Sequence, residues 1–180
     1  MKKNNSEKFN VTDLFVIFFG AITVFLVYFP GITGALYYDD YSNLGGLASI
    51  DRTKDALDFV FGGHAGPLGR PLALVSFLPH SAGWPENSEH VLFVNVIIHC
   101  LNFVLLYILS KLLIRRTTEF CDRKLRCVAF FAAFLWAVLP IIASTTLIAI
   151  QRMTGLSSFF GLLGLVAFVA CYGKLSRAPR

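Results

Sequence analysis

Two adjacent aspartates, Asp39 and Asp40, are the side chains in this sequence with the clearest chemical potential. They closely follow the first long apolar segment and stand among tyrosines at positions 37, 38 and 41. A carboxylate can deprotonate a hydroxyl group, and its oxygens suit a hard divalent cation such as Mg²⁺ or Mn²⁺. Two carboxylates so near an apolar segment are unfavourable unless they are solvated or used. We therefore interpret Asp39 and Asp40 as candidate catalytic residues and candidate metal ligands.

Two arginines stand where they could hold an anion. Arg70 follows the turn-rich segment 66–69, and Arg152 follows Gln151 between the last two apolar segments. A guanidinium group can fork onto phosphate oxygens, but near a membrane it can also simply extend toward lipid headgroups. Both interpretations of Arg70 stay open. The position of Arg152 is either incidental or retained for an anionic ligand.

A polar stripe crosses the second apolar segment, where Asn95, His99 and Asn102 recur at i, i+4 and i+7. This spacing places them on one face of a helix. Polar groups in a membrane helix usually face the bundle interior, where they bond to neighbouring helices or line a cavity. We expect either such bonds or a polar cavity lined by Asn95, His99 and Gln151.

The elements that must position these residues are membrane helices. Of 180 residues, 56% are hydrophobic and 15% are charged, which excludes an intrinsically disordered chain. Four cysteines are too few for a disulfide scaffold. The sequence predicts an all-α, polytopic membrane protein with a single domain over 1–180. We expect spans at about 12–30, 91–114, 127–150 and 153–172, an external loop at 31–90 and a cytoplasmic linker at 115–126.

Three features of these spans lead to further predictions. Pro140 predicts either a kink in the third span or a shorter crossing followed by an interfacial turn. Ser157, Gly161 and Gly164 predict a packing seam on the fourth span. We expect no charge pair inside the membrane and see no inverted repeat, which disfavours a transporter.

The distribution of charge predicts the orientation. The N-terminal tail, the linker with the end of the second span, and the C-terminus hold three, six and three of the sixteen Lys and Arg residues. Positive charge concentrates on the cytoplasmic side, so we expect a multi-pass protein of the inner (plasma) membrane with both termini in the cytoplasm. Outside these flanking loops no basic patch interleaves with aromatics, which disfavours nucleic-acid binding.

The external loop is too apolar and too patterned for disorder. Asp51 to Phe61, followed by two glycines, predicts a short amphipathic helix on the membrane surface. Leu72 to Leu78 is apolar but far too short to span, so it should lie in the interface or pack against the spans. We therefore expect short interfacial helices in this loop.

In this order and topology, the motifs resemble the N-terminal part of the GT-C superfamily of membrane glycosyltransferases, in the branch of the tetratricopeptide-containing membrane mannosyltransferases. The likeness covers roughly residues 10 to 175, and it is carried by Tyr38-Asp39-Asp40 with Asn43, Gly69-Arg70-Pro71-Leu72, Asn95 to His99, Leu139-Pro140 and Gln151-Arg152.

The resemblance implies an enzyme that uses a polyprenyl-phosphate-linked sugar on the external side of the membrane. It implies that Asp39 or Asp40 is the base or metal ligand, and that Arg70 and Arg152 hold the lipid-linked phosphate. Apart from the resemblance, we expect membrane lipid and a membrane partner protein as further partners.

The chain also departs from the family. Those enzymes generally have eight or more spans, and Leu139 stands where they have a histidine before the proline of the third span. We therefore expect a truncated or partial glycosyltransferase, for which catalysis without further spans is an open question. The alternative is a non-catalytic, small multi-pass subunit that binds lipid or a partner protein.

Overall fold

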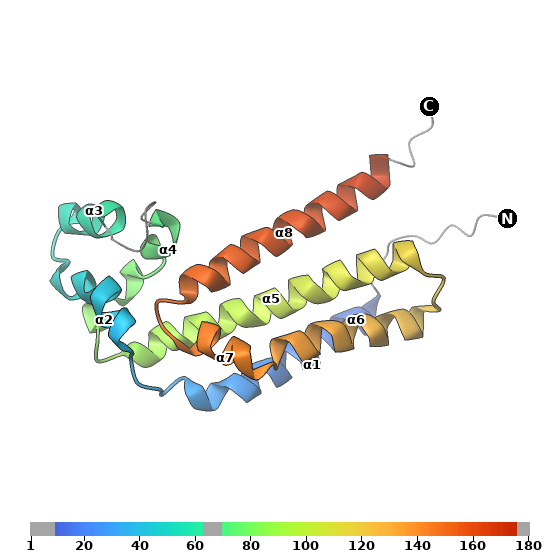
Figure 1. The fold of residues 1–180 in the computed structure, drawn as a ribbon, viewed down its shortest axis with the longest axis horizontal. Coiled ribbons are helices and arrows are strands. Elements are labelled where there is room, and N and C mark those ends of the chain that lie inside the picture. The colour runs from blue at the N-terminus through green and yellow to red at the C-terminus, as the bar shows by residue number, and fades with distance from the viewer. Residues whose placement is uncertain (1–9, 63–69, 176–180) are drawn as a thin grey trace.

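The computed structural model describes residues 10–62 and 70–175, in which helices are joined by short connections and no strand occurs (Figure 1). The predicted turn at 66–69 and the terminal basic residues at positions 2, 3, 8, 177 and 180 lie outside these residues. The helices are α1 (Val11–Tyr28), η1 (Phe29–Gly31), α2 (Tyr38–Leu44), η2 (Gly45–Ser49), α3 (Thr53–Gly62), α4 (Pro71–Val75), η3 (Leu78–Gly83), α5 (Ser88–Thr117), α6 (Asp122–Ala137), α7 (Pro140–Leu147) and α8 (Arg152–Leu175).

Three stretches are long and apolar enough to cross a membrane, namely Val11–Gly31, Ser88–Thr117 and Arg152–Tyr172. Helices α6 and α7 pass the same test only as a pair, bent by 62° at their junction. Pro140 begins α7 and has no N–H to continue the helix, so the break falls where the sequence placed a kink or interfacial turn. The all-α, polytopic membrane class is confirmed, with three candidate spans in the described residues, or four if the bent pair is one span.

The predicted linker at 115–126 is shorter than expected. Helix α5 continues to Thr117 and α6 begins at Asp122, so only residues 118–121 join them. Arg115 Nη2 lies 2.9 Å from Asp122 Oδ1 and ties the two helix ends together. Figure 1 shows this turn at the end of the bundle where α1 starts and α8 finishes, which we call the termini end.

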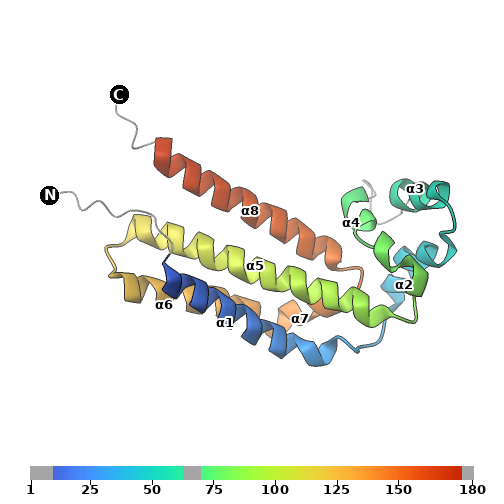
Figure 2. The same cartoon turned by 180° about the vertical axis from the view of Figure 1, so that it is seen from behind.

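Helix α5 lies at the centre of the bundle, and α1, α6 and α8 pack around it (Figure 2). Ala129, Ala133 and Ala137 are fully buried along one face of α6, and such small residues allow close helix approach. Gly20 does the same for α1, because a Cβ there would lie 2.6 Å from the ring of Phe103 on α5.

A buried ion pair joins α1 to α5 near the termini end. Lys111 Nζ lies 2.6 Å from Asp13 Oδ2, and the Tyr107 hydroxyl donates to Asp13 Oδ1 at 2.9 Å. All three side chains are buried. The expectation of no charge pair inside the membrane was wrong for the predicted spans, because Asp13 and Lys111 form a pair between the first and the second. Lys111 belongs to the bundle interior and not to the basic cluster predicted for the linker.

The small-residue seam predicted on the fourth span meets no other helix among the described residues. A Cβ added at Gly161 or Gly164 would meet no atom within 4 Å, so this face of α8 packs against nothing in the described residues. Only 6% of the most apolar window of α8 is buried, compared with 56% for α5. Helix α8 therefore presents most of its apolar surface to its surroundings.

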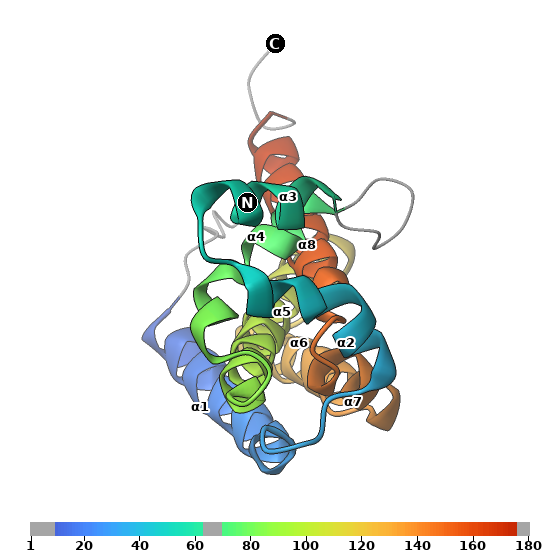
Figure 3. The same ribbon diagram turned by 90° about the vertical axis from the view of Figure 1, so that its left-hand side faces the viewer.

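The segment between α1 and α5 folds over the opposite end of the bundle, which we call the loop end. Seen from that end, α2, α3 and α4 cross in front of α5 and α8 (Figure 3). Helix α3 confirms the amphipathic helix expected between Asp51 and Phe61, with Val60 buried and Asp58 exposed. Leu74 and Phe77, from the short apolar stretch, are fully buried, so this stretch packs on the bundle.

Candidate functional site

Residues that are far apart in the sequence meet at residues 148–153, which join α7 to α8 and which we call the α7–α8 connector. It consists of Ile148 to Gln151 and the first two residues of α8. A connector between two membrane helices exposes backbone N–H and C=O groups that no helix satisfies, so other side chains must bond to them. Several predicted site residues do so.

The two aspartates have different environments. Asp40 is fully buried; its Oδ1 accepts the N–H of Ile150 at 2.7 Å, and its Oδ2 accepts the N–H of Tyr37 at 2.9 Å. Asp39 is exposed in the first turn of α2. Asp40 therefore fixes α2 to the α7–α8 connector, while the carboxylate of Asp39 is available to a ligand.

The arrangement does not fit a divalent cation held jointly by Asp39 and Asp40. Asp40 is inaccessible and already accepts two backbone hydrogen bonds, whereas the neighbouring carboxylate is on the surface. No three His, Cys, Asp or Glu side chains cluster as a metal site in the part of the chain that the structure describes.

Arg152 lies in the interior of the loop end, only 1% exposed. Its Nε donates to Asn95 Oδ1 at 2.8 Å, its Nη1 to the Ser76 carbonyl at 2.6 Å and its Nη2 to the Val91 carbonyl at 2.9 Å. The guanidinium carbon also lies 4.1 Å from the centre of the Phe77 ring, a cation–π contact. No carboxylate pairs with Arg152 among the described residues. Its positive charge is therefore solvated by protein dipoles but not neutralised.

Sequence reasoning missed His80, whose Nε2 lies 3.5 Å from Arg152 Nη2. Burial lowers the pKa of His80, and electrostatic interactions with Arg152 and His90 lower it further. A neutral ring can accept a hydrogen bond from the guanidinium, whereas a protonated ring would repel it. No spacing in the sequence pointed to this residue, because only the fold of η3 brings it to Arg152.

Arg70 differs from Arg152 in being exposed. Its backbone is left-handed, with φ 50° and ψ 53°, a conformation that residues other than glycine adopt at some energetic cost. Its Nη1 lies 3.5 Å from Met153 Sδ, next to Arg152 in the chain. Of the two arginines predicted as site residues, the exposed Arg70 therefore contacts the start of α8, and the buried Arg152 is the first residue of α8.

Asn95 and His99 bond to backbone carbonyls at helix ends, and Asn102 bonds to a carbonyl in the first turn of α8. Asn95 Nδ2 donates to Ile148 at 3.0 Å and Asn102 Nδ2 to Gly155 at 3.0 Å, while His99 Nε2 lies 2.9 Å from the Ala137 carbonyl. The Tyr28 hydroxyl donates to that same carbonyl at 2.8 Å, at the α6–α7 break. The polar stripe therefore makes interhelical bonds.

The stripe also borders a cavity of about 220 Å³ between α5, α7 and α8. Asn95, His99 and Arg152 line it, and so does Asn102, whose buried Oδ1 has no hydrogen-bond partner. Gln151 does not line this cavity; its Oε1 accepts the Thr154 hydroxyl at 2.7 Å. The two alternatives foreseen for the stripe, interhelical bonds and a cavity wall, thus occur together.

Comparison of the chain with family models, curated proteins and solved structures found no match. The resemblance to GT-C glycosyltransferases therefore stays a prediction that depends on the motifs and on the geometry of the loop end.

Proposed function

We propose that this membrane protein binds a polyprenyl-phosphate-linked sugar at its loop end and takes part in transferring that sugar. The observation that carries the proposal is the convergence of Asp40, Arg70 and Asn95 on the α7–α8 connector, to which each makes a direct contact. These three residues belong to three of the motifs that resemble the GT-C superfamily. The connector itself contains the buried, unneutralised cation Arg152, Arg70 adds an accessible guanidinium, and Asp39, the neighbour of Asp40 in α2, has an accessible carboxylate.

Each group has a proposed role. Asp39 accepts the proton of the acceptor hydroxyl, whose oxygen then bonds to the anomeric carbon of the sugar. The bond from that carbon to the donor phosphate breaks, and polyprenyl phosphate leaves with the negative charge. Arg70 contacts this phosphate, and the charge of Arg152 makes the potential of the site more positive. Asp40 and Asn95 are positioning residues, because their polar atoms are occupied within the protein.

In this proposal the loop end faces the exterior of the inner membrane, and both termini are cytoplasmic. The support is the charge distribution along the sequence: twelve of the sixteen Lys and Arg residues lie in the N-terminal tail, at 111–126 and at the C-terminus, and seven of the eleven acidic residues lie between positions 31 and 90.

The donor site can be tested on the full chain in lipid nanodiscs by titration with undecaprenyl phosphate. Arg70→Ala should weaken binding about tenfold or more, since hydrogen bonds to charged groups contribute roughly 1.5–3 kcal/mol. Arg52→Ala is the matched control, because Arg52 is an exposed arginine of the same segment that pairs with Asp55. Equal affinities in the two variants, or no saturable binding by the wild type, would refute the donor site.

The catalytic role is tested separately, by release of undecaprenyl phosphate from a panel of its sugar derivatives. Asp39→Asn should abolish release, and Asp58→Asn, at an exposed aspartate on α3, should leave it unchanged. Retained turnover in the first variant would contradict the assignment of Asp39 as the base.

The alternative, a non-catalytic subunit, is favoured by one observation: the uncovered apolar face of α8 around Gly161 and Gly164. Such a face suits packing against another membrane helix. Donor binding by the wild type without turnover on any sugar derivative, together with co-purification of a membrane protein that Gly161→Leu removes, would favour this alternative.

A further inference from the structure

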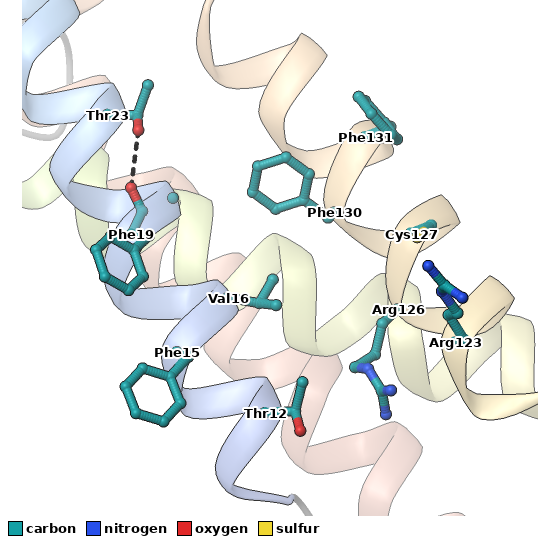
Figure 4. A pocket seen from close by; sticks show the side chains of 11 residues that line it. Thr12, Phe15, Val16, Phe19, Thr23, Arg123, Arg126, Cys127, Phe130 and Phe131 are labelled. Atoms are coloured by element: carbon teal, nitrogen blue, oxygen red, sulfur yellow. Dashed lines mark hydrogen bonds between the residues drawn. The ribbon is translucent and has the colours of Figure 1, made fainter.

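A groove of about 540 Å³ runs between α1 and α6 at the termini end, away from the proposed sugar-lipid site (Figure 4). Its walls are almost entirely apolar, and its lining includes Phe15, Val16, Phe19, Phe130 and Phe131. Three of these rings are more than half exposed, at 58% for Phe15, 61% for Phe19 and 57% for Phe131. The groove is therefore open along the outside of the bundle, where lipid chains lie in a membrane.

Toward one end of the groove, α1 packs closely on its neighbours, because a Cβ on Gly20 would lie 2.6 Å from the Phe103 ring and 2.9 Å from the Phe130 ring. On α1 the lining extends from Thr12 to Thr23. At a rise of 1.5 Å per residue this is about 16 Å, or roughly half of a 30 Å hydrocarbon core. The groove therefore has the length of one leaflet.

The other end of the groove carries two arginines, Arg123 and Arg126, from the first turns of α6. Figure 4 shows Arg126 extending into the space between α6 and the start of α1, near Thr12. Neither arginine forms an ion pair in the described part of the chain; the nearby Asp122 pairs with Arg115, and Asp13 pairs with Lys111. Among the described residues, no carboxylate therefore pairs with this local positive charge.

We propose that this groove binds one anionic phospholipid, with an acyl chain along the phenylalanines and the headgroup phosphate on Arg123 and Arg126. An apolar channel of one leaflet's length that ends in two guanidinium groups is complementary to such a lipid in both shape and charge. A zwitterionic lipid would fill the channel equally well but would gain less from the arginines. The site is independent of the sugar-lipid site and is specific for headgroup charge.

The test compares phosphatidylglycerol with phosphatidylcholine by native mass spectrometry of the full chain released from nanodiscs that contain both. The wild type should retain phosphatidylglycerol in preference to phosphatidylcholine. Arg123→Ala combined with Arg126→Ala should lower that preference about tenfold or more. Lys124→Ala is the matched control, since Lys124 also belongs to α6 but lies over the Phe120 ring, 4.2 Å from its centre, and not in the groove.

A second pair of variants tests the acyl channel without changing charge. Thr23→Trp places a large ring in the groove at the end far from the arginines and should reduce retention of both lipids several-fold, whereas Ile22→Trp, at an exposed position outside the groove, should not. Equal retention of both lipids by the wild type would overturn the proposal. The same is true of equal losses in the arginine and lysine variants, or in the two tryptophan variants.

Discussion

Lys111 at the termini end and Arg152 at the loop end are both buried cations, but the protein accommodates them differently. Lys111 forms an ion pair with Asp13, so the pair adds no net charge to the bundle. Arg152 is held by Asn95, by two backbone carbonyls and by a ring face, and has no carboxylate partner in the described residues. The ion pair is explained by helix packing alone. The unneutralised cation, next to an exposed arginine, is what we expect of a site for an anionic ligand.

The largest expected effect is at the ion pair. Lys111→Met leaves the buried Asp13 carboxylate without its counter-charge, which should lower stability by about 3–5 kcal/mol. Asp13→Asn combined with Lys111→Met should recover most of this loss, because no charge then remains buried. Thermal unfolding in detergent, followed by circular dichroism, measures both. A double variant as unstable as the single one would mean that the pair holds α1 by more than charge balance.

Arg152→Met should have a smaller effect, about 2–3 kcal/mol, because it leaves only neutral acceptors such as Asn95 Oδ1 without a donor. Arg152→Lys should recover part of the loss, since one ammonium group cannot reach all the acceptors that the guanidinium fork serves. The same unfolding assay applies. If Arg152→Met were more destabilising than Lys111→Met, the distinction between the two cations would fail.

Substitutions of the two adjacent aspartates should also differ in their effect on stability, because Asp40 is buried and Asp39 is exposed. Asp40→Asn puts an amide between two backbone donors, the N–H groups of Tyr37 and Ile150, and should cost about 1–3 kcal/mol. Asp39→Asn, on the surface, should change stability by less than about 0.5 kcal/mol while removing sugar transfer. Parallel unfolding and turnover measurements check both, and a large stability loss in Asp39→Asn would contradict an accessible carboxylate.

The smallest expected effect is a pH dependence at the loop end. Because the pKa of His80 is lowered in the folded protein, the unfolded chain binds a proton there more readily. The contribution of His80 to the free energy of unfolding should be fully present above about pH 6.5, the ordinary histidine pKa, and should decrease as the pH falls below that value. His80→Gln should flatten that part of the profile. An identical pH profile for this variant and the wild type would show that His80 does not stay neutral beside Arg152.

Spacing alone could predict which residues face the bundle interior, and the i, i+4, i+7 stripe of α5 shows this. It could not predict that Asn95 and His99 bond to the carbonyls of Ile148 and Ala137, because these carbonyls lie where α7 and α6 end, and spacing does not show where a helix will end. It could not separate Asp39 from Asp40 either, since the orientation of α2 over the connector decides which carboxylate is buried. Lys111 was grouped with the basic cluster because its partner, Asp13, lies 98 positions away.

The most direct test of the central claim, that the loop end holds the lipid-linked phosphate, is photolabelling of the full chain in nanodiscs with a photoreactive polyprenyl-phosphate analogue, followed by peptide mapping. We predict that the label attaches both near Arg70, within 70–80, and on the α7–α8 connector, and that Arg70→Ala but not Arg52→Ala reduces it. Label confined to the exposed faces of α1 and α8, and unchanged in Arg70→Ala, would contradict the account.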